Sequence, residues 1–128
     1  KRAGILTISA STLTERHLSM AKVPETTPIG TTEGGREFTR AILGNEPELD
    51  VEAARADNVE AALAMKDAHP DLGAIVLECT NMTPYAADLR KVTGLSVFSI
   101  YTFVNWFHQG LVPDRFRLEL DDPRAGLY

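Results

Sequence analysis

The chain has 128 residues, of which 44% are hydrophobic and 24% are charged, and its formal net charge at pH 7 is -5. This length predicts one domain with a substantial buried core, and the acidic balance argues against a nucleic-acid partner. A single cysteine excludes an internal disulfide framework and a cysteine-rich metal site, and it favours a reducing, cytoplasmic setting. Because no apolar run approaches the roughly 18 residues of a membrane span, we expect no membrane partner.

The N-terminal half alternates short apolar, β-branched runs with helical patterns. These patterns predict a strand over residues 3–8, a helix over about 13–20, a weak strand around Ile29 and a helix over about 37–43. The segment Ser9-Ala10-Ser11-Thr12, between the first strand and the first helix, is a small polar turn that can cap that helix.

A long helix follows. Asp50 is a suitable N-cap for it, and His69-Pro70 ends it. Its apolar stripe is expected to consist of Ala56, Val59, Ala62 and Leu63.

The C-terminal half again alternates strand and helix. We predict a central strand over residues 72–79, a helix that starts near Pro84 and ends at a Gly94 C-cap, a strand over 95–101 and a helix that begins at Thr102.

Four strand–helix alternations with short connections predict right-handed βαβ units. The expected fold class is therefore α/β, as a three-layer, flavodoxin-like parallel sheet of about four strands flanked by helices, with strand order 2-1-3-4. We assign residues 1–112 to this lobe and residues 113–128 to a C-terminal tail or extension. The abrupt start inside a strand suggests a piece of a longer protein, whose partner is a first lobe or a second copy of the chain.

The single cysteine, Cys79, is the most informative candidate for chemistry. It is predicted to end the central strand just before a helix, and ligands of open α/β sheets bind outside the carboxyl ends of the strands. A helix dipole favours the thiolate there. The alternative interpretation is equally open, because a lone cysteine that ends a buried strand is often a small core hydrophobe.

Polar groups at three predicted strand ends are expected to share one sheet edge. These are residues 9–12, residues 79–81, and Tyr101-Thr102. Hydroxyls, an amide and helix N–H groups form a natural cradle for a carboxylate or a phosphate. A carboxylate-bearing ligand beside a thiolate suggests nucleophilic attack or proton abstraction next to that carboxylate.

Other candidates are weaker. His17, His69 and His108 lack metal-ligand spacing, so surface or core roles are favoured for them and no metal site is expected. Glu78 is predicted to point to the face opposite Cys79, where a structural role is favoured.

The segment Leu77-Glu78-Cys79-Thr80-Asn81-Met82-Thr83-Pro84-Tyr85-Ala86 resembles the aspartate/glutamate/hydantoin racemase superfamily, which carries a Cys-Thr segment after the central strand of its second lobe. The resemblance extends from about Ala3 to Phe116. It implies a cofactor-independent enzyme with two α/β lobes, in which two cysteines work on opposite faces of a small carboxylate-bearing substrate.

Carried over to this chain, the resemblance makes Cys79 the second-lobe acid/base. Thr80, with the backbone N–H groups after it and with Asn81, would hold the substrate carboxylate, helped by Ser9, Ser11 or Thr12. We therefore expect an amino-acid racemase or epimerase in its full-length form.

The chain departs from the superfamily pattern in two ways. It has no second cysteine, and Asn81 stands where some members carry His or Glu, so substrate specificity does not transfer. Two alternatives stay open. One is a single-cysteine decarboxylase of the arylmalonate type, and the other is a non-catalytic module that binds a small acid or a protein.

Overall fold

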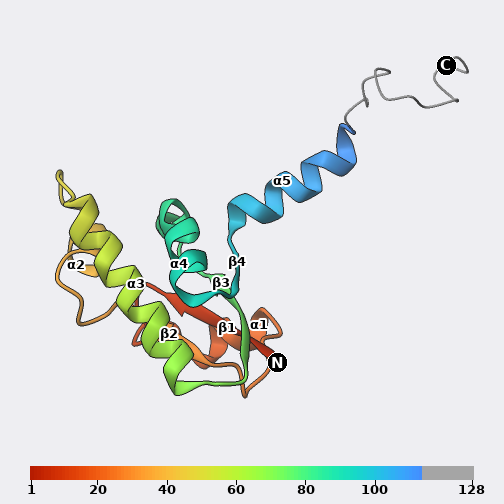
Figure 1. Ribbon diagram of the computed structural model, residues 1–128, viewed down its shortest axis with the longest axis horizontal. Coiled ribbons are helices and arrows are strands. Elements are labelled where there is room, and N and C mark those ends of the chain that lie inside the picture. Colours follow the sequence, from red (N-terminus) through yellow and green to blue (C-terminus); the bar gives the residue numbers. More distant parts are fainter. Residues whose placement is uncertain (114–128) are drawn as a thin grey trace, which may run out of the picture.

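The computed structural model describes residues 1–113 and has the α/β architecture expected from the sequence (Figure 1). Four parallel strands form one sheet in the order β2-β1-β3-β4, which confirms the predicted strand order. The strands are β1 (Arg2–Thr7), β2 (Ile29–Thr31), β3 (Leu72–Leu77) and β4 (Ser96–Phe98). The predicted tail, apart from its first residue, lies outside the described residues.

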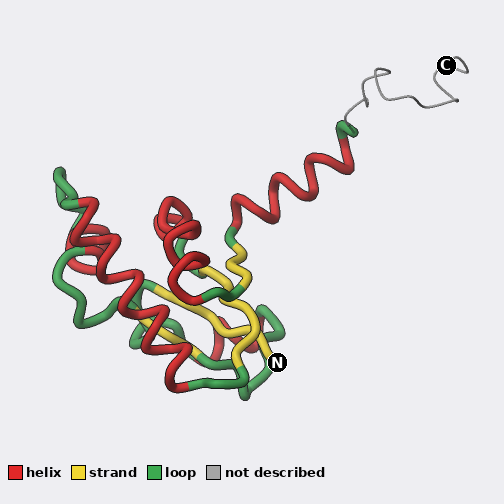
Figure 2. The backbone as a smooth tube through the Cα atoms, viewed as in Figure 1, coloured by secondary structure: helices red, strands yellow, loops and turns green. Residues whose placement is uncertain are grey.

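Helices connect the strands, and each strand is followed by one or two helices before the next strand begins (Figure 2). The helices are α1 (Glu15–Met20), α2 (Phe38–Leu43), α3 (Val51–Ala68), the 3-10 helix η1 (Thr80–Tyr85), α4 (Ala86–Thr93) and α5 (Ile100–Leu111). Helices α3 and α4 pack side by side over one face of the sheet, whereas α5 projects away from the body (Figure 1).

The hydrophobic core lies between the sheet and the α3–α4 layer. Leu6 of β1 and Ile75 of β3 are fully buried there, together with Met82 of η1 and Leu89 of α4. The next residue of β3, Val76, is exposed, as expected when successive side chains of a strand point to opposite faces. One face of β3 is therefore covered by helices and the other is open.

Helix α3 approaches β1 and β2 closely because both strands carry a glycine beneath it. A Cβ atom at Gly30 would lie 3.0 Å from the sulfur of Met65, and one at Gly4 would lie 3.3 Å from the same atom. Met65 is almost fully buried. Its thioether therefore fills the space that strand side chains would otherwise occupy.

The ends of α3 match the sequence prediction. The Asp50 carboxylate accepts hydrogen bonds from the backbone N–H groups of Glu52 and Ala53, so Asp50 is the N-cap. The predicted apolar stripe is shifted, however. Ala62 is buried as expected, but Ala56, Val59 and Leu63 are only partly buried. The buried face of the helix consists of Ala54, Asp57, Asn58, Ala62 and Met65.

Polar Asp57 lies on the buried face because it holds the start of α2. Its carboxylate accepts hydrogen bonds from the backbone N–H groups of Arg36, Glu37 and Phe38 at 2.9, 2.7 and 2.8 Å. Burial raises the pKa of Asp57, but these three donors outweigh it and leave the pKa below its usual 3.8. Gly35 makes the approach possible, because a Cβ atom there would lie 2.6 Å from the carboxylate carbon.

Three predicted boundaries in the C-terminal half were wrong. The central strand ends at Leu77, so Cys79 lies beyond β3 and not within it. The helix expected from Pro84 is preceded by the 3-10 helix η1, although its Gly94 C-cap is confirmed in the left-handed conformation, with φ of 70°. The last strand stops at Phe98, because Ser99 caps α5 three residues before the predicted helix start.

We predict that Asp57→Ala lowers the free energy of unfolding by about 3 kcal/mol, because it leaves one buried and two partly buried N–H groups without their acceptor. Urea denaturation measures the loss, and Glu60→Ala on the exposed side of α3 is the control. Because the folded pKa is lowered, the carboxylate's contribution is complete above the usual 3.8 and disappears as the pH falls through the folded value. An equal loss in both variants would contradict the assignment.

Candidate functional site

The carboxyl ends of all four strands meet at one edge of the sheet. Thr7 of β1 is in register with Thr31 of β2, Leu6 with Leu77 of β3, and Val76 with Phe98 of β4. The segments that follow the strands therefore gather at this edge, which we call the carboxyl edge. Ligands of open α/β sheets bind at such edges.

The turn after β1 is occupied by a carboxylate from the turn after β2. Ser9 donates its hydroxyl to Glu33 at 2.8 Å, and the backbone N–H of Ser11 donates to the same carboxylate at 3.1 Å. The Ser11 hydroxyl donates to it as well. Thr12 joins indirectly, by donating to the Ser9 hydroxyl at 2.9 Å. The structure thus brings Ser9, Ser11 and Thr12 together as expected, around a carboxylate of the chain itself.

These donors keep Glu33 ionised. The Ser11 hydroxyl, the Ser9 hydroxyl and the Ser11 backbone N–H, in that order, lower the pKa of Glu33 from its usual 4.5 to about 2. The turn therefore holds a carboxylate of the chain itself and carries a negative charge at neutral pH. Binding of a ligand's carboxylate by Ser9, Ser11 and Thr12 stays a prediction.

Cys79 lies at the same edge, two residues beyond β3. It is the N-cap residue of η1, with φ of −80° and ψ of 127°, and its carbonyl oxygen accepts a hydrogen bond from the backbone N–H of Met82 at 3.1 Å. The thiol is free and half-buried against the core. This position combines core contacts with partial exposure.

The residues after Cys79 present polar groups to solvent. Thr80 and Asn81 begin η1 and are both exposed. The hydroxyl of Thr83, one turn further on, is buried without a hydrogen-bond partner among the described residues.

Glu78 connects the ends of β1 and β3. Its carboxylate accepts a hydrogen bond from the buried Thr7 hydroxyl at 2.8 Å, and its backbone N–H donates to the carbonyl oxygen of Leu6 at 2.9 Å. These contacts fix the backbone that leads to Cys79. The structural role favoured from the sequence stays a prediction.

Tyr101 and Thr102, expected at a strand end, lie in the first turn of α5 instead. The Thr102 hydroxyl donates to the carbonyl oxygen of Ser99 at 2.8 Å, and the Ser99 backbone N–H donates back to that hydroxyl at 2.9 Å. Thr102 is therefore part of a helix cap, so its hydroxyl is engaged and not presented to a ligand.

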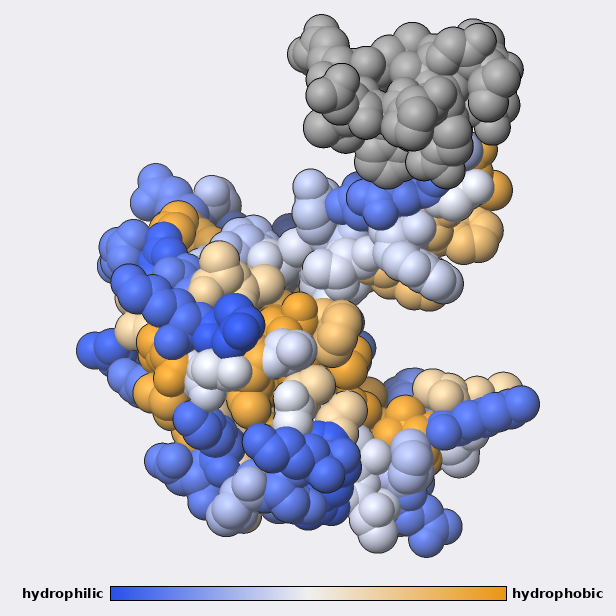
Figure 3. Space-filling model, turned by 45° about the vertical axis from the view of Figure 1, so that its right-hand side comes forward, coloured by the Kyte–Doolittle hydropathy of each residue, from blue (hydrophilic) through white to orange (hydrophobic). Residues whose placement is uncertain are grey.

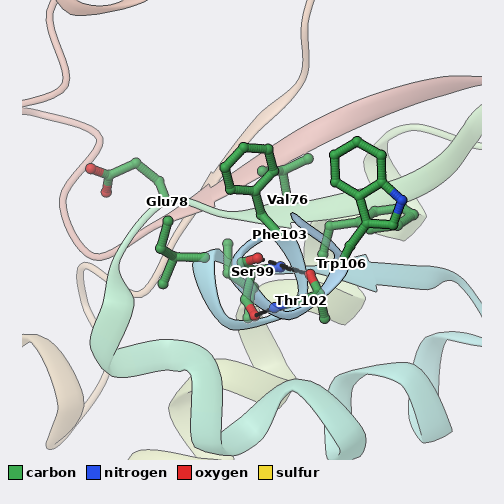
Figure 4. Close-up of a pocket in the computed structure, with 9 residues that line it drawn as sticks. Val76, Glu78, Ser99, Thr102, Phe103 and Trp106 are labelled. Carbon is green, nitrogen blue, oxygen red and sulfur yellow. Dashed lines mark hydrogen bonds between the residues drawn. The ribbon is translucent and has the colours of Figure 1, made fainter. Parts of the chain in front are cut away.

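A cleft of about 680 Å³ lies beside the carboxyl edge, between β3, β4 and α5. Its wall is mainly apolar, with Val76, Phe103 and Trp106 around it, and the Glu78 carboxylate points away from them (Figure 4). Glu78 lines this cleft, and its neighbour Cys79 does not. The cleft borders the candidate site without containing the thiol.

Within residues 1–113, no three side chains of the types His, Cys, Asp and Glu cluster as a metal site would require. Over the same residues, none of the helices is both long and apolar enough to span a membrane.

Glu33 is the site residue that sequence reasoning missed. The signal was present, because the weak strand around Ile29 ends two residues before it. In a parallel sheet the ends of neighbouring strands lie together, so Glu33 had to reach the turn that contains Ser9. A carboxylate that fills the expected anion cradle could have been inferred from that register.

Comparison with known proteins gives one informative relative. The chain is 36% identical over 91 residues to a protein from Durusdinium sp. clade D named dimethylsulfoniopropionate lyase. The match covers 71% of this chain but spans 27% of the relative's length. No protein-family model matches the chain, and no solved structure matches it significantly. The relative's name is that of a lyase, and lyases are an enzyme class different from the isomerases expected from the sequence.

We predict that the carboxylate of Glu33 titrates with a midpoint near 2 in an NMR titration of the folded chain. Ser11→Ala removes the largest cause of the lowered pKa and moves the midpoint toward 4.5. Ser19→Ala is the control, because its hydroxyl donates only to the carbonyl oxygen of Arg16. An unchanged midpoint in Ser11→Ala would show that these hydroxyls do not hold the charge.

Proposed function

We propose that this chain supplies Cys79 as the acid/base of an enzyme that acts on a small carboxylate-bearing substrate. The proposed reaction is the elimination of dimethyl sulfide from a carboxylate with a sulfonium group on its β-carbon. The observation that carries the proposal is the free, half-buried thiol at the carboxyl edge. The similarity to the dimethylsulfoniopropionate lyase supports the choice of elimination.

One base is enough for this reaction. The Cys79 thiolate takes the proton from the carbon next to the carboxylate, and the C–H electron pair forms a C=C bond. The C–S bond breaks at the same time or afterwards, and its electron pair leaves with the sulfur as neutral dimethyl sulfide. An unsaturated carboxylate remains, and the thiol then returns its proton to solvent.

The substrate carboxylate is best held by the groups that follow the thiol. Thr80 and Asn81 are exposed directly beside Cys79. Charge accumulates on the carboxylate as the α-proton leaves, so donors fixed there stabilise the transition state more than the ground state. Ser9, Ser11 and Thr12 stay candidate donors, but Glu33 already accepts hydrogen bonds from Ser9 and Ser11.

The charge of Glu33 favours a zwitterionic substrate over a simple acid. A fixed anion at the carboxyl edge repels a second carboxylate and attracts a cationic group. A sulfonium carboxylate has both groups that this arrangement favours. Its carboxylate would bind near Thr80, and its cationic sulfur would lie toward Glu33.

A racemase is the second candidate, and the Cys-Thr segment at residues 77–86 favours it. Racemisation requires a second acid/base on the opposite face of the α-carbon, and this chain contains one cysteine. Elimination needs no such group. Both reactions begin with the same proton abstraction, so one variant tests the shared step.

We predict that Cys79→Ser reduces the release of dimethyl sulfide from dimethylsulfoniopropionate by at least about 100-fold, because general-base catalysis contributes roughly that much. Headspace gas chromatography measures the gas, and NMR in deuterium oxide measures α-proton exchange. Ser19→Ala on helix α1 is the control variant, because the Ser19 hydroxyl donates to the carbonyl oxygen of Arg16 within the same helix.

Each outcome separates the candidates. Gas release that depends on Cys79 supports the lyase, whereas α-proton exchange without gas release supports the racemase. Full activity in Cys79→Ser overturns the role of the thiol. If the wild-type chain binds the substrate without turnover or α-proton exchange, both catalytic proposals are wrong. That result would support the alternative of a non-catalytic module that binds a small acid.

A further inference from the structure

The C-terminal part of the described chain carries an unusual surface. From Val92 to Pro113 the sequence contains no Asp, Glu, Lys or Arg. Within this stretch every residue of α5 is exposed, including Phe103 at 59% and Trp106 at 68%. Contiguous apolar surface of this extent is rare on monomers and marks an interaction site.

A second apolar surface lies on the body of the same chain. Val76 of β3 and Phe98 of β4 are exposed on the sheet face opposite the α3–α4 layer. Both line the cleft beside α5. Figure 3 shows hydrophobic side chains on the body and on the part of the molecule that projects beside it.

The two surfaces are complementary. A parallel sheet requires helices on both faces, and the open face of β3 and β4 lacks one. Helix α5 has the apolar spacing of a helix that covers a sheet, with large side chains at Ile100, Phe103, Phe107 and Leu111. The described part of the chain therefore contains a sheet face, that of β3 and β4, which no helix covers, and a helix, α5, which packs on no sheet.

The connection before α5 is short, and the helix projects from the sheet without covering it (Figure 1). A single residue, Ser99, separates β4 from α5, whereas βα connections usually have about 2–6 residues. Reciprocal capping bonds between Ser99 and Thr102 fix the direction in which the helix leaves. Its main contacts are with β4 and η1 at its first turn, and the remainder extends outward (Figure 1).

We propose that two copies of this chain exchange their α5 helices, so that each helix covers the open β3–β4 face of the other copy. The exchange uses the same two surfaces on both copies, which gives a closed two-fold dimer. The exchange buries the apolar side chains of α5 and the open β3–β4 face at the same time, and it requires no third surface.

The available area is adequate for a stable dimer. Five aromatic residues between Phe98 and Phe107 are each more than half exposed. At about 150–250 Å² for a buried aromatic side chain, they alone expose roughly 500 Å² per chain. Two copies, with the aliphatic side chains of α5 and Val76 added, exceed the ~1,200 Å² at which specific interfaces begin.

The absence of charge in this stretch favours a protein surface over a lipid surface. Helices that lie on membranes carry Lys or Arg on their polar face, and residues 92–113 contain none. His108 is the only residue in the stretch with a basic side chain.

Trp106 is the chain's only tryptophan, so its emission reports on α5 alone. We expect light scattering to give twice 14.0 kDa at high protein concentration, and the emission of Trp106 to shift to shorter wavelength in parallel with the mass. Phe103→Glu places a charge in the exchanged interface and keeps the chain monomeric, with long-wavelength emission at all concentrations. Leu43→Glu on the exposed side of α2 is the matched control and leaves the dimer intact. Circular dichroism verifies that both variants are folded.

Four results would overturn the exchange. A 14.0 kDa monomer with solvent-exposed Trp106 at all concentrations means that no second copy binds. A monomer with short-wavelength emission that does not depend on concentration means that α5 covers its own sheet. A shift that appears only with phosphatidylcholine vesicles means that α5 binds lipid. A Phe103→Glu dimer as stable as wild type places the interface elsewhere.

Discussion

A parallel β-sheet has to be covered on both faces, and this requirement governs the whole molecule. Helices α3 and α4 meet it on one side, where Ile75, Leu77 and Leu6 are buried. On the other side Val76 and Phe98 remain exposed. The positions of the core, the cleft and the projecting helix α5 all follow from this one-sided coverage. Strand β3 thus has one face that helices cover and one face that is exposed.

The common direction of the strands has a second consequence, because it gathers every post-strand turn at one edge. The turn after β1 supplies hydroxyls, the turn after β2 supplies Glu33, and the segment after β3 supplies Cys79. The hydroxyls and the backbone N–H of the first turn hold the chain's own carboxylate, Glu33. It also gives the edge a fixed charge, so a ligand with a positive group complements the site better than a dianion does.

The sequence was sufficient for the fold class, the strand order and the Asp50 and Gly94 caps, because periodicity and capping are local properties. It failed where a tertiary contact decided the outcome. The apolar stripe predicted for α3 did not include Asp57, yet Asp57 is buried because three N–H groups of a distant turn need an acceptor. The edge residues Ser9, Ser11 and Thr12 were found from the turn that contains them, whereas Glu33 required the register of β1 with β2.

The close contact of Met65 with Gly4 and Gly30 has a consequence for how the protein ages. The thioether is shielded from oxidants as long as α3 stays on the sheet. If the helix lifts briefly, a peroxide can convert the sulfur to a sulfoxide, which is polar and carries an additional oxygen. The sulfoxide is larger and more polar than the thioether that lies against Gly4 and Gly30, so the oxidised side chain fits this layer less well. The rate at which Met65 oxidises therefore measures how often this layer opens.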